Sequence, residues 1–175
     1  DEISHARVTF ALASAYAGTD LGPQAFLEAK RMAPATDLAT WARETIEDGC
    51  LGETIAAAEA HVAAQQSEDP VVRDVLLGIA EDETRHAELA WKILRLALQA
   101  GGEEVATVAR TTLATLAVRQ QSPSEDRNAD LIQHGILGAG ASARLRTKVI
   151  NVVVQPCLER LLQTLPGEAC EVQVP

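Results

Sequence analysis

The segment VVRDVLLGIAEDETRHAELAWKILRLAL, residues 71–98, decides the fold of this chain. Its apolar residues recur at alternating spacings of four and three, a pattern typical of a helix that buries one stripe in a bundle. Glu83 and His86 fall inside this stripe, together with Val72, Leu76, Ile79, Ala90, Ile93 and Ala97. A carboxylate buried alone would cost several kcal/mol or more, so the sequence predicts a cation, an ion pair or a shifted pKa beside Glu83.

The rest of the chain also favours helices over strands. Helices are expected over residues 2–18, 37–66, 70–101, 103–120 and 142–165. Asp37 can cap the second of these helices, and Pro70 suits the first turn of the third, so these two helices form a tight hairpin. Pro156 is expected to interrupt the last helix, because proline lacks a backbone donor.

Length and composition predict one all-α domain over residues 1–175. Only 3% of the residues are aromatic, and a length of 175 residues does not require a second core. The metal-site helices described below fall in residues 1–100, and residues 103–175 form a C-terminal helical extension. The predicted fold class is therefore an all-α helical bundle with additional C-terminal helices.

The acidic net charge of the chain bears on which partners it can bind. The formal net charge of −10 argues against nucleic acid and against anionic membranes as partners. No apolar run reaches the 18 or so residues that a membrane span needs. The compartment stays open, with the cytoplasm favoured.

The three cysteines have no zinc-like spacing. Cys50 is expected to be a buried thiol. A bridge between Cys157 and Cys170 is the alternative use of the other two in an oxidising compartment.

A second Glu-x-x-His pair opens the chain. Glu2 and His5 repeat the spacing of Glu83 and His86, and they share one helical stripe with Thr9, Leu12 and Tyr16. Residues three apart lie on the same face of a helix, so each pair could offer two ligands to one metal ion.

Glu53 is expected at the same level of the bundle. At about 1.5 Å per residue, Glu53 lies about 23 Å from the hairpin turn, Glu83 about 22 Å and His86 about 26 Å. Gly49 and Gly52 leave room around it. Glu53 is therefore expected to face the other helix of the hairpin at the level of Glu83 and His86.

Three carboxylates and two imidazoles at one level match most of a carboxylate-bridged dimetal site, in which two helices each give one Glu and two others each give Glu-x-x-His. Such a mixture suits iron or manganese better than magnesium or calcium. The alternatives are a buried ion pair between Glu83 or His86 and Arg85 or another neighbour, fraying of Glu2 and His5 at the terminus, and a plain surface role for Glu53.

At these residues the sequence resembles the ferritin-like superfamily, and within it the bacterial ferritin-like domain proteins. The motifs DEISHAR (1–7), GCLGETIAAAEA (49–60) and IAEDETRHAELAWK (79–92) carry the likeness, which covers residues 1–100 well. The resemblance implies that the metal ligands are Glu2, His5, Glu53, Glu83 and His86. It also implies that Glu83 or Glu2 bridges the two ions.

The family has a further helix, which carries a sixth ligand, before the helix of Glu2. Because the sequence begins at Asp1, this helix is expected to be missing. It could come from a second copy in a homodimer or from another fragment, or the tail helices could fill its place. Glu103 and Glu159 are candidate replacement ligands.

Three functions follow as expectations. The first is a diiron or dimanganese oxidoreductase that reacts with dioxygen or peroxide, either as a ferroxidase or as an oxidase of a small organic substrate. The second is non-enzymatic binding or storage of iron, manganese or zinc. The third is a helical module that binds no metal in this form.

Overall fold

The computed structural model describes residues 1–25, 37–118 and 129–164, and every regular element in these ranges is helical. This confirms the all-α class. The elements are α1 (Glu2–Ala17), α2 (Leu38–Glu44), η1 (Thr45–Glu53), α3 (Thr54–Gln66), α4 (Pro70–Val118), η2 (Ala129–His134), α5 (Ala139–Val149), η3 (Ile150–Val154) and α6 (Gln155–Gln163). η1 and η3 are π-helical, and η2 is a 3-10 helix.

α2, η1 and α3 form one uninterrupted helical run. The Asp37 side chain caps its start by accepting a hydrogen bond of 2.7 Å from the backbone N–H of Thr40, as expected. The π-helical stretch was not anticipated, and it ends at Glu53. Within it, a Cβ atom on Gly49 would lie 2.6 Å from the Cβ of Ala90, so only glycine allows η1 to approach α4 this closely.

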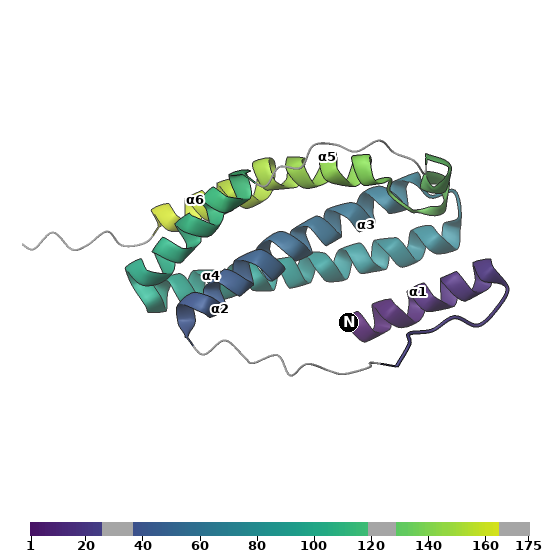
Figure 1. The fold of residues 1–175 in the computed structure, drawn as a ribbon, viewed down its shortest axis with the longest axis horizontal. Helices are drawn as coiled ribbons and strands as arrows, with labels where there is room; N and C mark the ends of the chain where they lie inside the picture. The colour runs from purple at the N-terminus through teal and green to yellow at the C-terminus, as the bar shows by residue number, and fades with distance from the viewer. Residues whose placement is uncertain (26–36, 119–128, 165–175) are drawn as a thin grey trace, which may run out of the picture.

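α4 corresponds to the two helices expected over residues 70–101 and 103–120, which a sharp turn joins. Gly102 adopts φ 51° and ψ −132°, a conformation that glycine reaches easily, and it separates the two helical parts. The first part packs against α3 as the second arm of the hairpin, and the later part folds back over the bundle (Figure 1). The break predicted at the two adjacent glycines is therefore confirmed.

The apolar core lies between the hairpin, the later part of α4 and the C-terminal helices. Its fully buried large side chains include Ile46, Leu94, Leu98, Val105, Val154 and Leu158. α5, η3 and α6 continue as one helical run, and the π-helical stretch ends at Val154, two residues before Pro156. The predicted interruption at this proline is thus a change of winding and not a break in the helix.

α1 differs from the other long helices because none of its residues is buried. It lies beside α4, on the side opposite α3 (Figure 1). The Tyr16 hydroxyl donates a hydrogen bond of 2.8 Å to Asp69, and its ring meets the ring of His134 edge-on at 5.8 Å. Of the stripe predicted on this helix, His5 and Leu12 are partly buried, whereas Glu2, Thr9 and Tyr16 are exposed.

The cysteine prediction is confirmed where the structure describes it. Cys50 is fully buried, and burial together with nearby Cys157 raises the pKa of its thiol to about 12. Cys157 is exposed on α6, whereas Cys170 lies outside the described residues. Within the described ranges, no helix has both the length and the apolar character required to cross a membrane.

Candidate metal centre

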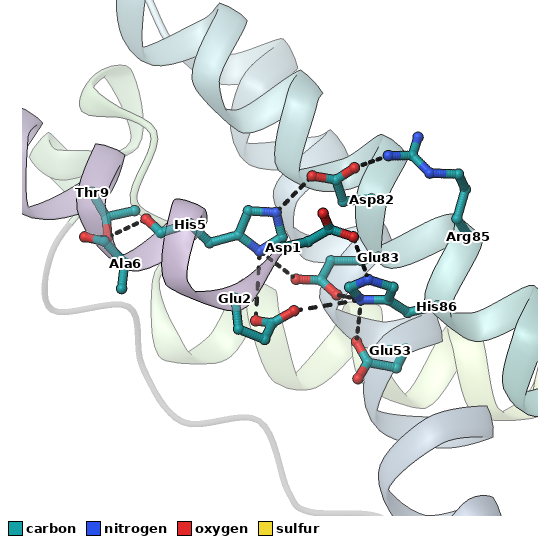
Figure 2. Close-up of polar contacts among 10 residues, drawn as sticks. All are labelled: Asp1, Glu2, His5, Ala6, Thr9, Glu53, Asp82, Glu83, Arg85 and His86. Carbon is teal, nitrogen blue, oxygen red and sulfur yellow. Dashed lines mark hydrogen bonds and ion pairs between the residues drawn. The ribbon is translucent and has the colours of Figure 1, made fainter.

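Five side chains predicted as ligands meet in the space between α1, η1 and α4 (Figure 2). α1 contributes its first turn, η1 its last residue and α4 its middle, and the side chains point toward one another. The set is Glu2, His5, Glu53, Glu83 and His86. Glu53 lies beside Glu83 and His86, as predicted from their similar distances to the hairpin turn.

The five residues divide into two groups that share one member. Glu2, His5 and Glu83 form the first group, with their ligand atoms all within 4.8 Å of one another. Glu53, Glu83 and His86 form the second group within the same limit. Glu83 belongs to both, and its Oε1 lies near His5 while its Oε2 lies near His86.

His5 directs one ring nitrogen into the centre. Its Nδ1 lies 3.3 Å from Glu83 Oε1 and 3.5 Å from Glu2 Oε2. Its Nε2 donates to Asp82 at 2.8 Å, and since a carboxylate only accepts hydrogen bonds, the proton of a neutral ring sits on Nε2. Nδ1 is buried and makes no hydrogen bond with any residue that the structure describes. An unprotonated nitrogen and two carboxylates are all electron-pair donors, which is the donor set that a cation requires.

His86 on α4 also turns its Nδ1 toward these carboxylates, but this Nδ1 forms a hydrogen bond with Glu83. Its Nδ1 lies 3.1 Å from Glu83 Oε2, 3.5 Å from Glu2 Oε1 and 3.9 Å from Glu53 Oε2. Its Nε2 lies 3.0 Å from Asp1 Oδ2. Each imidazole thus turns Nδ1 toward the shared carboxylate and Nε2 toward an aspartate on the other helix.

The two aspartates were missed by the sequence analysis. Asp1 precedes Glu2 and Asp82 precedes Glu83, so both pairs belong to a five-residue pattern, Asp-Glu-x-x-His. The repetition of the aspartate was the signal that could have found them. Carboxylates that hold the outer nitrogen of a histidine fix its orientation and raise its basicity as a metal ligand.

Burial and charge set different protonation states for Glu53 and Glu83. Burial, a hydrogen bond with Glu83 and the negative charges of Glu83 and Glu2 raise the pKa of Glu53 to about 7, against the opposing effect of His86. Burial also opposes the charge on Glu83, but hydrogen bonds from Glu53 and His86 and the charges of His5 and His86 outweigh it and lower its pKa. Glu53 therefore takes up a proton more readily than Glu83 does.

The ligands of the centre differ in how far they are shielded from water. The Glu83 side chain is 8% exposed and His5 is 12% exposed, whereas Glu2 is 70% exposed. The expectation that Glu2 faces inward therefore needs correction: its carboxylate reaches both imidazoles, but from the solvent side.

The other candidates lie elsewhere. Glu103 pairs with Arg110, and Glu159 accepts a hydrogen bond from Gln155 at 3.2 Å, so neither joins the candidate centre. The alternative was an ion pair of Glu83 or His86 with Arg85 or another neighbour. Arg85 pairs with Asp82 instead, and the neighbours at ion-pair distance from Glu83 are His5 and His86.

Comparisons of this chain with protein-family models, with curated proteins and with solved structures gave no match. The functional argument therefore depends on the geometry of the centre.

Proposed function

We propose that this chain is a ferritin-like protein that binds two transition-metal ions between α1, η1 and α4. The observation that carries the proposal is the shared position of Glu83. One imidazole and one further glutamate flank it on each side, so each ion would have one nitrogen ligand, one terminal carboxylate and one oxygen of Glu83. A carboxylate-bridged dimetal site uses this division of ligands.

The ligand chemistry favours iron, with manganese or zinc as alternatives. Three carboxylates offset most of the charge of two divalent ions, and one imidazole for each ion suits a first-row transition metal. Magnesium and calcium prefer sites made of oxygen alone. Asp1 and Asp82 would hold the outer nitrogens of the two imidazoles and keep each Nδ1 directed at its ion.

A purely structural ion-pair network fits less well. In such a network a protonated His5 would donate from both ring nitrogens, yet Nδ1 has no hydrogen-bond partner although two carboxylates lie within 3.5 Å. A metal ion between Nδ1 and these oxygens would satisfy all three groups at once.

Iron in this centre would supply the electrons that reduce dioxygen or peroxide, which makes an oxidoreductase the first candidate. The chain's own residues hold the ions, balance their charge and orient the imidazoles. Ferroxidase activity and oxidation of a small organic substrate both fit this arrangement.

Metal binding without turnover is the second candidate, and the open side of the centre favours it. With Glu2 70% exposed and Asp1 53% exposed, water has free access to one side of the proposed ions. A fourth helix over this side would exclude water and complete the ligand set.

Metal loading tests the proposal first. The protein is loaded with ferrous iron without oxygen, desalted and analysed for metal content, intact mass and native mass. About two ions per chain are expected. Oxygen consumption after air is admitted would then distinguish an oxidoreductase from a binding protein.

The matched control is the Glu81→Gln variant, because Glu81 is an exposed glutamate on the same helix outside the centre. This variant should load as the native chain does. Failure of the native chain to retain iron, manganese or zinc would overturn the proposal in favour of the ion-pair network.

A further inference from the structure

A groove of about 620 Å³ lies between α4 and α6, apart from the metal centre. None of its lining residues belongs to the candidate metal groups. Its apolar surface comes from Trp91, Pro156 and Leu161, and three cationic side chains, Lys92, Arg95 and Arg160, line it as well. The volume falls in the range of small-molecule sites, about 300–1,000 Å³.

The groove follows from the way two helical faces meet. Trp91 and Arg95 are four residues apart on α4, and Cys157 and Leu161 are four residues apart on α6, so each pair lies on one face of its helix. α6 packs against α4, and Leu158 of α6 is fully buried in the core. The space beside these two helices is lined by both apolar and long charged side chains.

The charge of the groove is opposite to that of the molecule. The chain has 25 acidic and 15 basic residues, yet three cations and one acid, Glu88, line this groove. Glu88 pairs with Lys92 at 3.6 Å. Within the described part of the chain, Arg95 and Arg160 have no ion pair. Two guanidinium groups that line a groove with apolar residues are thus available to an anion.

We propose that this groove binds a monomeric anionic amphiphile, with its apolar chain against Trp91 and Leu161 and its carboxylate held by Arg95 and Arg160. The planar fork of arginine matches a carboxylate better than the point charge of a lysine does. This site does not depend on the proposed metal centre.

Size and charge favour a small molecule over larger partners. A stable protein interface buries about 800 Å² on each side, which is more than a groove lined by a few side chains on two helices provides. An anionic bilayer would be repelled by the net charge of −10, whereas a single amphiphile meets only the local cations.

Cys157 gives a direct readout, because it is an exposed thiol in the groove while Cys50 is buried. The experiment uses the full chain with Cys170→Ser, so that Cys157 is the accessible thiol. Decanoate below its micellar concentration is titrated while alkylation of Cys157 by a neutral maleimide is followed. Saturating decanoate is expected to slow alkylation about tenfold or more, since the occupant covers the thiol.

Charge variants test the recognition. Arg95→Gln with Arg160→Gln should weaken protection by decanoate about tenfold or more, as expected for loss of charge-assisted hydrogen bonds. Arg146→Gln is the matched control, because Arg146 is an exposed arginine on α5 outside the groove. Quenching of Trp91 fluorescence in a Trp41→Phe background gives an independent measure of binding.

The counter-ligands are decanol, decyltrimethylammonium and anionic phospholipid vesicles. Weaker protection by all three than by decanoate supports the proposal. Equal protection by decyltrimethylammonium, protection by vesicles but not by decanoate, or unchanged decanoate binding in the double arginine variant would each overturn it.

Discussion

α1 and α4 carry the same five-residue pattern, Asp-Glu-x-x-His, in opposite surroundings. On α4 the pattern lies in the middle of a helix that contributes Ala90, Leu94 and Ala97 to the core, and its Glu83 is 8% exposed. On α1 no residue is buried, and Glu2 is 70% exposed. The pattern fixes which ligand types a helix presents, but tertiary packing decides how far each ligand is shielded from water.

The difference also concerns what holds each helix in place. α4 is held by apolar burial, which does not depend on ions or pH. α1 is held largely by polar contacts, among them His5 with Asp82, His86 with Asp1 and Tyr16 with Asp69. Some of the proposed ligands thus lie on α4, which the apolar core fixes in place. Others lie on α1, which is held against α4 partly by these same ligand side chains.

The largest effect is expected from exchanging the two glutamates of the pattern for glutamine. Glu83→Gln should reduce metal content from about two ions to none, because Glu83 belongs to both ligand groups. Glu2→Gln should leave about one ion, because Glu2 belongs only to the group of His5. Elemental analysis after anaerobic loading with ferrous iron measures both.

Thermal melting of the metal-free variants supplies the control for this pair. Glu83→Gln loses the hydrogen bonds and ion pairs that lower the pKa of Glu83, so its melting temperature should fall, and a cooperative transition would show that the fold is kept. Equal metal loss in the two variants would mean that Glu83 does not bridge.

The sequence predicted those parts of the molecule that follow from periodicity and chain geometry. The stripe through Glu83 and the distance of Glu53 from the hairpin turn place these residues in the centre, because helical rise is constant. The winding of η1 and the exposure of Glu2 were not predicted. Both depend on how closely neighbouring helices approach, as Gly49 against Ala90 illustrates, and single-chain periodicity holds no such information.

A smaller effect is expected on the docking of α1. Amide exchange in α1 should be fast in the metal-free protein, since helices with few buried apolar contacts open at low free energy. Binding of two ions would link α1 to α4 and slow exchange there about tenfold or more, with little change around Leu94 in the core. Hydrogen-exchange mass spectrometry with and without manganese measures this.

The Glu83→Gln variant is the control for exchange, because manganese should leave its α1 unprotected. Slow exchange of α1 in the absence of any metal would contradict the view that its ligands hold it in place.

The smallest effect is the pH dependence of the metal-free protein. The pKa of Glu53 is about 7 in the folded state against an ordinary value of 4.5, so between these values the folded chain holds a proton that the unfolded chain has lost. Stability from this group therefore falls as pH rises from about 5 to 7 and levels off above it. Glu83, whose pKa is lowered, acts in the opposite direction, and its contribution is lost only as pH falls below about 4.5.

Glu53 faces Glu83 and His86 on α4 and Glu2 on α1, so the Glu53→Gln variant isolates its share of the pH effect. Urea unfolding at pH 5, 6 and 7 should give a smaller decline in stability for Glu53→Gln than for the native chain. The α1 ligands alter this comparison little, because Glu2 is the weakest of the causes acting on Glu53. An identical decline in both proteins would place this proton elsewhere in the centre and would remove Glu53 as the group that a metal ion has to deprotonate.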